Sequence, residues 1–308
     1  MGAGNTAEGV RIDGSLATGN AITGNFIGTN AAQTGPLGNS ASGVFIRRAP
    51  GNSVTNNTVR FNLGFAGVAM CGNVGGFCGG NDEGTQTSNG DGNAVNSNFI
   101  SNNSGRGVSL DGVANTAVGT GGGNNISDNG DSGVVISGAG ATGNQTRLNA
   151  INSNTGNGVH IVGAGNTRND VTGNTFINNS GLAIDLAGDG VTLNDGLGDA
   201  DAGPNDLQNF PVITAVATGQ VDGQLDSTPN TTVSIQLFTA TACDASGHGE
   251  GEDIVATFDV LTDGTGFVSF AQSGLTLPVG KFVTATATAR TPTPFGNTSE
   301  FLACVVVP

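Results

Sequence analysis

The densest group of potential metal ligands in the sequence is an acidic, glycine-rich stretch that begins at Asp185. Several oxygen donors on a tightly curved backbone are what a hard cation such as Ca²⁺ requires. The spacing lacks the distal Glu of an EF-hand loop, so that geometry is not implied. We predict a calcium site here, with a solvated acidic linker as the alternative. The predicted ligands are Asp189, Asp195, Asp199, Asp201, Asn205 and Asp206.

Two other groups of polar residues are weaker candidates. Asp82, Glu83 and Asp91 form a sparse acidic group in a glycine-rich stretch. His248 is close in sequence to Glu250, Glu252 and Asp253, and these residues could together bind a metal. We prefer the interpretation that they form a mobile acidic loop. His160 is isolated in an apolar repeat and is interpreted as an exposed strand residue, not as a general base.

The four cysteines favour disulfide bonds over metal binding. Cys71 and Cys78 are close in sequence, whereas Cys243 and Cys304 belong to the C-terminal part of the chain. We predict the pairs Cys71–Cys78 and Cys243–Cys304, which suit an oxidising compartment. Zinc is the competing interpretation, but the spacing of the first pair is unusual for zinc and no histidine is near it.

A repeated pattern predicts the elements that position these residues. The motif Gly-apolar-x-apolar recurs, and its last four copies start at Gly107, Gly133, Gly158 and Gly181, at spacings of 26, 25 and 23 residues. Short segments that begin with Asn lie between the copies. A fixed period of this length indicates a solenoid, because one turn cannot bury its apolar face alone. We therefore predict a parallel β-helix over residues 1–190, in which the wider early gaps are skipped or expanded turns.

The motif also predicts which side chains face inward, because alternate residues of a strand point to one face. The expected inward stack is Val10, Ile12, Val44, Ile46, Val108, Leu110, Val134, Ile136, Val159, Ile161, Leu182 and Ile184. The outward positions carry few carboxylates. Only Asp111 and Asp185 offer a candidate catalytic pair on a common edge.

The rest of the chain changes character after the acidic stretch. Residues 191–206 form a Gly-rich acidic junction, and residues 207–308 alternate β-branched and polar residues. Seven short strands are predicted in that second part, with turns at Asp222-Gly223, Pro229-Asn230 and Asp263-Gly264. This pattern predicts an immunoglobulin-like antiparallel β-sandwich.

Composition limits the classes of partner. The 308 residues carry a formal charge of −15 and include one lysine, Lys281. A nucleic acid or an anionic membrane surface is therefore not expected, because phosphate binding requires clustered Lys and Arg. The sequence has no apolar run of about 20 residues, the length of a membrane span. The first residues already resemble the repeat, so we expect that an export signal or earlier coils are missing.

Several segments together resemble a known group of proteins. Residues 24–29, 37–40, 181–186, 199–201, 207–213 and 296–301 resemble secreted bacterial proteins with right-handed parallel β-helix repeats and a C-terminal immunoglobulin-like module. The resemblance spans nearly the whole chain. It implies a pectate-lyase-like coil and an extracellular or cell-surface location. It does not imply a reaction, because one fold hosts many functions.

These observations favour an extracellular structural or adhesive protein without catalysis. The alternative is a polysaccharide lyase, a glycosidase or a glycan-binding protein. Sugar binding commonly uses exposed aromatic platforms, and this chain has no Trp or Tyr. A surface glycan is therefore the less favoured partner.

Self-association is the favoured partnership. The open N-terminal end of a β-helix presents unpaired backbone groups. We expect it to pair with residues 304–308 of another copy and to form an open filament. Loss of earlier coils is the rival explanation for a bare end.

Overall fold

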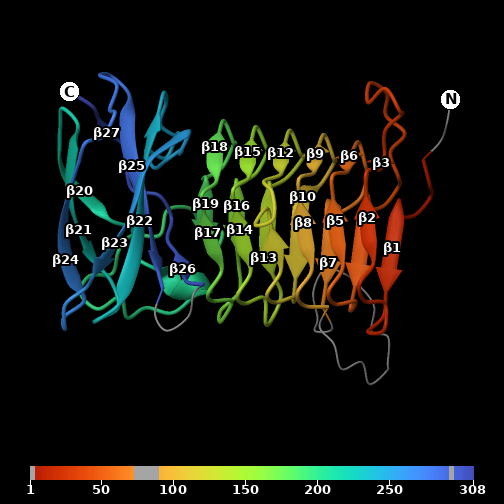
Figure 1. The fold of residues 1–308 in the computed structure, drawn as a ribbon, viewed down its shortest axis with the longest axis horizontal. Helices are drawn as coiled ribbons and strands as arrows, with labels where there is room; N and C mark the ends of the chain where they lie inside the picture. The colour runs from red at the N-terminus through yellow and green to blue at the C-terminus, as the bar shows by residue number, and fades with distance from the viewer. Residues whose placement is uncertain (1–3, 73–89, 291–294) are drawn as a thin grey trace.

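Three parallel sheets run along the N-terminal part of the chain and antiparallel sheets form the rest (Figure 1). The computed structural model describes residues 4–72, 90–290 and 295–308. The predicted fold class, a parallel β-helix followed by an immunoglobulin-like sandwich, is confirmed. No helix in the described part is long and apolar enough to cross a membrane.

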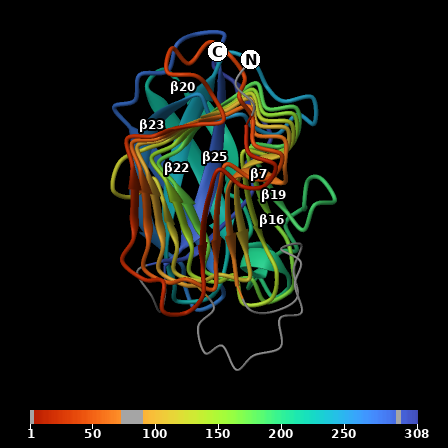
Figure 2. The same cartoon turned by 90° about the vertical axis from the view of Figure 1, so that its right-hand side faces the viewer.

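Each coil contributes one strand to each parallel sheet, so the strands stack in register along the coil axis (Figure 2). Sheet 1 consists of β1 (Val10–Asp13), β4 (Val44–Arg47), β7 (Ala66–Cys71), β10 (Arg106–Asp111), β13 (Val134–Ser137), β16 (Val159–Ile161) and β19 (Ile184–Leu186). Sheet 2 consists of β2 (Ala21–Thr23), β5 (Ser53–Thr55), β8 (Ala94–Asn96), β11 (Ala117–Val118), β14 (Gln145–Arg147) and β17 (Asp170–Thr172). Sheet 3 consists of β3 (Phe26–Ile27), β6 (Thr58–Arg60), β9 (Phe99–Ser101), β12 (Asn125–Ser127), β15 (Ala150–Asn152) and β18 (Thr175–Ile177).

The inward columns of sheet 1 follow the predicted stack except in the last coil. Val108, Val134 and Val159 occupy one column, and the next residue in that column is Ile184. Leu186 then pairs with Ile161. The prediction that Leu182 and Ile184 continue the two columns is therefore wrong by two residues, because Ala183 occupies the place that Gly158 has in the coil before.

The wide gaps between early repeats are expanded turns and not skipped ones. β1 pairs directly with β4, and β7 pairs directly with β10. Among the described residues, no further strand of sheet 1 stands between these partners. Residues 73–89 lie outside the described ranges. Cys78, Asp82 and Glu83 belong to that segment, so the predicted Cys71–Cys78 bond and the sparse acidic group involve residues outside the described ranges.

Asparagines at the coil corners form ladders that run parallel to the axis. In the longest ladder, each side-chain Oδ1 accepts hydrogen bonds from the backbone N–H and side-chain Nδ2 of the preceding Asn. Its rungs are Asn5, Asn39, Asn62, Asn103, Asn129, Asn154 and Asn179. Because an amide both donates and accepts, one buried side chain satisfies corner groups on two coils.

The C-terminal part is a two-sheet sandwich. One sheet has the order β20 (Val212–Ala217), β21 (Gln220–Asp226), β24 (Phe267–Ser273). The other has the order β23 (Asp253–Leu261), β22 (Thr232–Ala240), β25 (Phe282–Ala289), β26 (Asn297–Thr298), with β27 (Val305–Val306) also on β25. The strand predicted over residues 300–306 is present only as β27, and β26 comes before that range.

The C-terminal run forms part of its own sandwich. β27 pairs with β25 of the same chain, and Val307 is buried in the sandwich core. Residues 304–308 thus contribute a strand to their own sandwich, and the filament contact through them stays a prediction.

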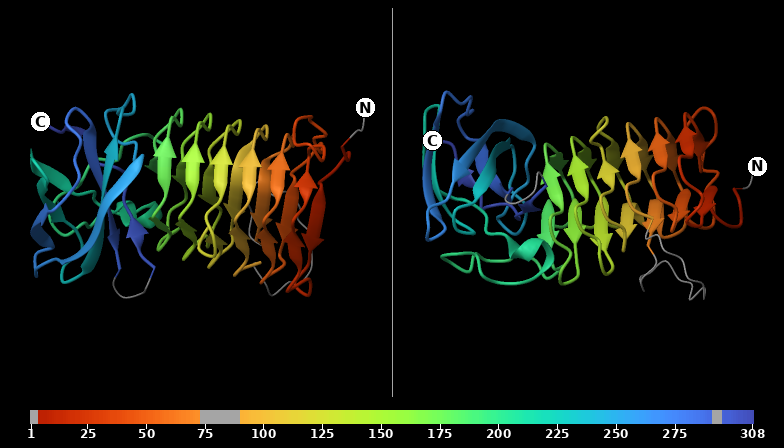
Figure 3. Two further views of the ribbon diagram at one scale, coloured as in Figure 1. Left: turned by 45° about the horizontal axis from the view of Figure 1, so that its top comes forward. Right: turned by 60° about the horizontal axis from the view of Figure 1, so that its bottom comes forward.

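The sandwich sits on the last coil (Figure 3). The last coil strand ends at Leu186, a 3₁₀ helix covers Pro204–Leu207, and the first sandwich strand begins at Val212. Phe301 of the sandwich contacts Phe176 of the coil edge-on, with ring centroids 5.7 Å apart, and both rings belong to one apolar core. The two parts therefore share buried surface.

Candidate metal centre at the coil–sandwich junction

Three carboxylates of the acidic loop converge at the junction. Asp195, Asp199 and Asp201 each offer an oxygen, and these oxygens lie within 4.8 Å of one another. Asn209, next to the first sandwich strand, fixes the loop: its Nδ2 donates to Asp195 Oδ1 at 3.1 Å and its backbone N–H donates to Asp199 Oδ1 at 3.1 Å. The cluster is thus held between the end of the coil and the start of the sandwich.

The remaining oxygens of the cluster are unevenly satisfied. Asp195 Oδ2 accepts hydrogen bonds from the backbone N–H groups of Ala200 and Asp201, at 3.1 and 3.2 Å. Ser227 Oγ lies 3.4 Å from Asp199 Oδ2. Asp201 Oδ1 is buried and has no hydrogen-bond partner in the described structure.

Electrostatics within the cluster disfavours three bare charges. Burial and the charges of Asp195 and Asp201 raise the pKa of Asp199 to about 7, although the N–H of Asn209 opposes the shift. Burial and Asp195 also raise the pKa of Asp201. A cation among these oxygens would remove the repulsion that raises both pKa values.

The structure does not bring the other predicted ligands into this cluster. Asp206 accepts a hydrogen bond from Asn297 Nδ2 at 2.7 Å, and the charge of Asp189 acts on Asp185. Asn205 is committed elsewhere: its Oδ1 accepts from Asn169 N–H at 3.0 Å, and its Nδ2 donates to the carbonyls of Asn169 and Thr298. Asn205 is therefore the last rung of an asparagine ladder and not a metal ligand.

Two buried glutamates, Glu250 and Glu300, close the open edge of the coil, a role that the sequence did not indicate for either. Glu250 Oε1 accepts from the backbone N–H of Asn179 at 2.8 Å and so takes the place of the next asparagine rung. Glu300 accepts from Leu186 N–H at 2.7 Å and from Thr192 N–H at 2.8 Å. Because an uncovered strand edge templates further pairing, these carboxylates act as a cap.

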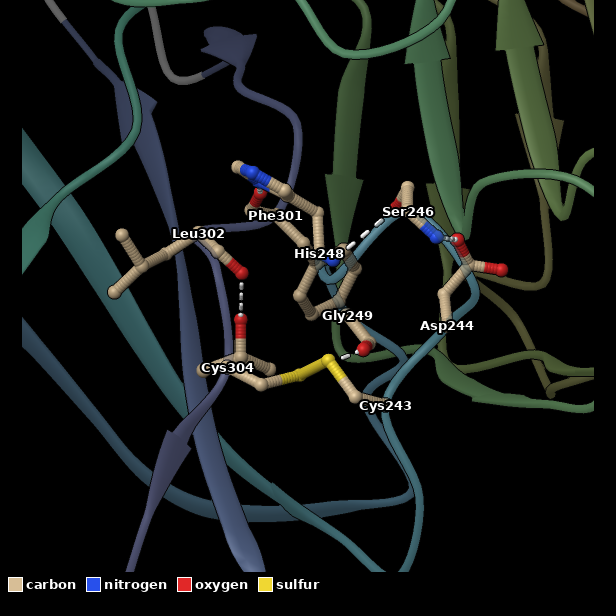
Figure 4. The surroundings of a disulfide bond; sticks show 9 residues. Cys243, Asp244, Ser246, His248, Gly249, Phe301, Leu302 and Cys304 are labelled. Carbon is tan, nitrogen blue, oxygen red and sulfur yellow. Dashed lines mark hydrogen bonds between the residues drawn. A yellow bond between two sulfur atoms is a disulfide. The ribbon is translucent and has the colours of Figure 1, made fainter.

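The loop that carries Glu250 is anchored by a disulfide bond. Cys243 and Cys304 are bonded, as the sequence predicted, and His248 Nδ1 lies 3.0 Å from the carbonyl oxygen of Phe301 (Figure 4). The side chains beside Glu250 also have other partners: Glu252 accepts from Thr241, and Asp253 pairs with Lys281 at 3.1 Å. The alternative metal set around His248 is therefore not assembled.

A second polar group lies on the outer face of sheet 1. His160 and Asp185 are register partners on adjacent coils, whereas Asp111 pairs with Ser137 in another column. The predicted edge shared by Asp111 and Asp185 is therefore wrong. Asp185 accepts from Asn157 Nδ2 at 2.8 Å and from Gly188 N–H at 3.0 Å.

This group extends towards the N-terminus as a chain of hydrogen bonds. Ser132 Oγ accepts from Asn157 N–H at 3.1 Å and donates to Asp131 at 3.2 Å, and Asp131 lies 3.3 Å from Arg106 Nε. Burial raises the pKa of Asp185 and lowers that of His160. Titratable groups with shifted pKa values mark candidate functional sites. The sequence did not indicate the pairing of His160 with Asp185, because the repeat motif places Ala183 at that position of the last coil.

The fold and the junction define a parallel β-helix protein whose C-terminal end is capped by a sandwich. The family described as "Periplasmic copper-binding protein (NosD)" matches residues 3–195. The chain belongs to this family. No curated protein matches the sequence.

Two solved structures show distant similarity. The enzymatically active domain of tailspike protein 2 of bacteriophage CBA120 has 11% identity and a TM-score of 0.26, with 99% of this chain and 77% of that chain covered. Tailspike protein gp49 of the Acinetobacter baumannii bacteriophage Fri1, a capsular polysaccharide depolymerase, has 9% identity and a TM-score of 0.20, with 99% of this chain and 67% of that chain covered.

These structures contradict the expectation of a protein without catalysis, because both are described as enzymatic or as depolymerases. That expectation is withdrawn. The similarity is too low to assign a reaction to this chain.

The family description raises the question of copper. Copper sites in proteins use imidazole, thiolate and thioether ligands. Among the described residues, the group that offers three close His, Cys, Asp or Glu ligand atoms contains only carboxylates. The described residues do not fit a copper site.

Proposed function

We propose that this protein is an extracytoplasmic β-helix protein in which Ca²⁺, held by Asp195, Asp199 and Asp201, locks the coil to the sandwich. The observation that supports the proposal is the convergence of three carboxylate oxygens within 4.8 Å. Calcium prefers several oxygen ligands in flexible geometry. The periplasmic family description and the Cys243–Cys304 disulfide support the location.

The position of the cation explains what it would do. Asp195 and Asp199 bind Asn209 at the start of the sandwich, and Asp199 also lies beside Ser227 after β21. A cation there would tie the loop after the coil to two sandwich segments. The coil would then be a rigid support that presents its lateral faces outside the cytoplasm.

Chelation tests this proposal. Calcium should raise the melting temperature, because a ligand that binds only the folded state adds about 2.7 kcal/mol at 100 times its Kd. In Asp199→Asn the increase in melting temperature with calcium should disappear. The melting temperature in chelator should not fall, because the substitution removes the repulsion by Asp195 and Asp201. Asp189→Asn, in the same loop but outside the cluster, should behave like wild type. An unchanged melting temperature on chelation, with no calcium found by elemental analysis, would disprove the proposal.

A second candidate function is saccharide recognition on the outer face of sheet 1. The hydrogen-bonded chain from Arg106 through Asp131 and Asn157 to Asp185 favours it, because donors and acceptors alternate over adjacent coils as a hydroxyl-rich polymer requires. Affinity electrophoresis against bacterial polysaccharides would test this. Asp131→Asn should weaken retardation and Asp128→Asn, an exposed residue of the same coil, should not. Release of new reducing ends would show that the protein also cleaves the polysaccharide. If the protein migrates equally with and without every polysaccharide, saccharide recognition is ruled out.

A further inference from the structure

Two phenylalanines stand on the outer face of sheet 3 with their side chains exposed. Phe26 of β3 and Phe99 of β9 are 49% and 37% exposed, because the inward positions of their strands belong to Ile27 and Ile100. Thr58 of β6 pairs with both, so the two phenylalanines lie two strands apart in one outward column (Figure 1). Two strand spacings are about 9.5 Å, which is close to the distance between alternate sugar units of an extended polysaccharide.

Exposed rings in this arrangement fit a carbohydrate. The face of an aromatic ring carries partial negative charge, and the C–H groups on one side of a pyranose carry partial positive charge, so sugars stack on such rings. Rings two strands apart therefore match alternate sugars of a chain that runs along the coil axis. Thr58, with a hydroxyl that can donate or accept a hydrogen bond, lies between the two phenylalanines.

A guanidinium group beside Phe99 adds a fixed positive charge. Cζ of Arg60 lies 5.4 Å from the centroid of the Phe99 ring and 4.7 Å from that of Phe61. Its Nη1 donates to the carbonyl of Gln33 at 3.0 Å and its Nη2 donates to Asn102 Oδ1 at 2.7 Å, so neutral oxygens hold the side chain. These bonds leave the N–H of Nε, which is buried, and a further N–H on each terminal nitrogen.

The charges around Arg60 favour an acidic ligand. The other arginines of the coil strands each form an ion pair with a carboxylate, and these are Arg11, Arg47, Arg106 and Arg147. Arg60 has no such partner in the described part of the chain. The six strands of sheet 3 contain no Asp or Glu, although the chain has 24 of them. The first carboxylate along the adjoining corner is Asp128, two coils beyond Arg60.

We infer that Phe26, Thr58, Arg60 and Phe99 form a binding surface, the Phe–Arg surface, for a polysaccharide that contains uronic acids. The polysaccharide lies along the coil axis, with sugars stacked on the two rings and a carboxylate bound by the terminal N–H groups of Arg60. A planar guanidinium matches the geometry of a carboxylate. The Phe–Arg surface belongs to a different sheet from the polar group on sheet 1, and it does not rest on the proposed calcium site.

Affinity electrophoresis of the full chain in chelator tests the inference. The probes are three uronate polymers, polygalacturonate, alginate and hyaluronate, each beside its own methyl ester, which keeps the sugar chain and removes the charge. We expect at least one uronate polymer to retard the protein, and its methyl ester to retard it less. The chelator keeps the proposed calcium site out of the comparison.

Two variants separate the stacking from the charge. Phe26→Ala/Phe99→Ala should weaken the affinity for the uronate polymer by about tenfold, because both rings are lost. Arg60→Gln should weaken it by about tenfold through loss of a charged hydrogen bond, and should leave no preference for the polymer over its methyl ester. If the alanine variant melts early, Phe26→Leu/Phe99→Leu, which is apolar but not aromatic, takes its place.

Matched variants on other surfaces are the controls. Leu148→Ala removes a side chain that is 60% exposed at a corner two coils beyond Phe99, and Arg168→Gln removes an exposed arginine at another corner. Both should be retarded like the wild type. Asp131→Asn, the test of the sheet 1 candidate, should also be retarded like the wild type, so the two surfaces are distinguished.

Three results would overturn the inference. They are retardation by none of the uronate polymers, retardation that Phe26→Ala/Phe99→Ala leaves intact, and equal retardation by a polymer and its methyl ester. If the rings instead join two copies of this chain, light scattering will show a dimer that the double variant dissociates. That result without uronate binding also overturns the inference.

Discussion

Single side chains end the repeating pattern of the coil. Asn179 would meet another asparagine in a further coil, and it meets Glu250 Oε1 at 2.8 Å instead. Glu300 does the same for sheet 1 through Leu186 N–H at 2.7 Å. A buried carboxylate with two N–H donors satisfies orphan backbone groups that would otherwise cost about 1–3 kcal/mol each.

Glu300 makes stability depend on pH. Burial raises its pKa from the usual 4.5 to about 7, against the hydrogen bonds from Leu186 and Thr192. Because the folded state then binds the proton more tightly than the unfolded state, this stabilisation is fully present below pH 4.5 and is lost as pH rises to about 7. One pKa unit corresponds to about 1.4 kcal/mol, so the loss is about 3 kcal/mol.

In Glu300→Gln the part of this pH dependence that Glu300 contributes should disappear. We expect the free energy of unfolding of the wild type to fall between pH 4.5 and about 7, and that of the variant to fall less. Urea unfolding in chelator across this range measures both. Glu252→Gln, a half-exposed carboxylate of the neighbouring loop, should keep the wild-type slope. Identical slopes for Glu300→Gln and wild type would show that Glu300 does not titrate there.

At the scale of elements, the inward columns stabilise the coil. Ile136 is fully buried between Leu110 and Ile161, its register partners in sheet 1. No single coil can bury this face, because each strand receives its neighbours only from the coils on either side.

Ile136→Asp should therefore destabilise the coil strongly. Loss of the packed side chain alone costs about 2–5 kcal/mol, and a buried unpaired carboxylate adds to this. Asn125→Asp, on the exposed outer face of sheet 3, is the matched control and should change stability by less than about 0.5 kcal/mol. Thermal unfolding measures both variants, and an unchanged melting temperature in Ile136→Asp would rule out the inward stack.

At the scale of the whole molecule, coil and sandwich should unfold together. Phe301 links them, with its ring 5.7 Å from Phe176 in the coil and 4.9 Å from Phe238 in β22. Thr298 Oγ and the carbonyl of Gly251 also accept hydrogen bonds from coil residues Val171 and Phe176. The apolar core is therefore continuous across the junction.

Phe301→Ala should uncouple the two parts. Phe to Ala in a core costs about 3–5 kcal/mol, and here the loss falls on the junction, so calorimetry should show two transitions where the wild type shows one. Phe258→Ala, whose ring packs on Phe270 within the sandwich with centroids 5.4 Å apart, is the control and should lower the melting temperature but keep a single transition. A single transition in Phe301→Ala would show that the junction is held by other contacts.

The sequence by itself determined the local choices: the repeating coil, the inward faces of most strands, the sandwich and the carboxylate-rich loop. These follow from side-chain periodicity and turn chemistry, which act between near neighbours. Only the tertiary structure decided which atoms close the open edge. Glu250 lies 71 residues from Asn179 in the chain, and Glu300 lies 114 residues from Leu186. No local pattern indicates such partners, because an unpaired backbone N–H can donate to any oxygen that packing brings to it. For the same reason only the tertiary structure separates Asn205, which is a rung of an asparagine ladder, from the three aspartates whose oxygens converge.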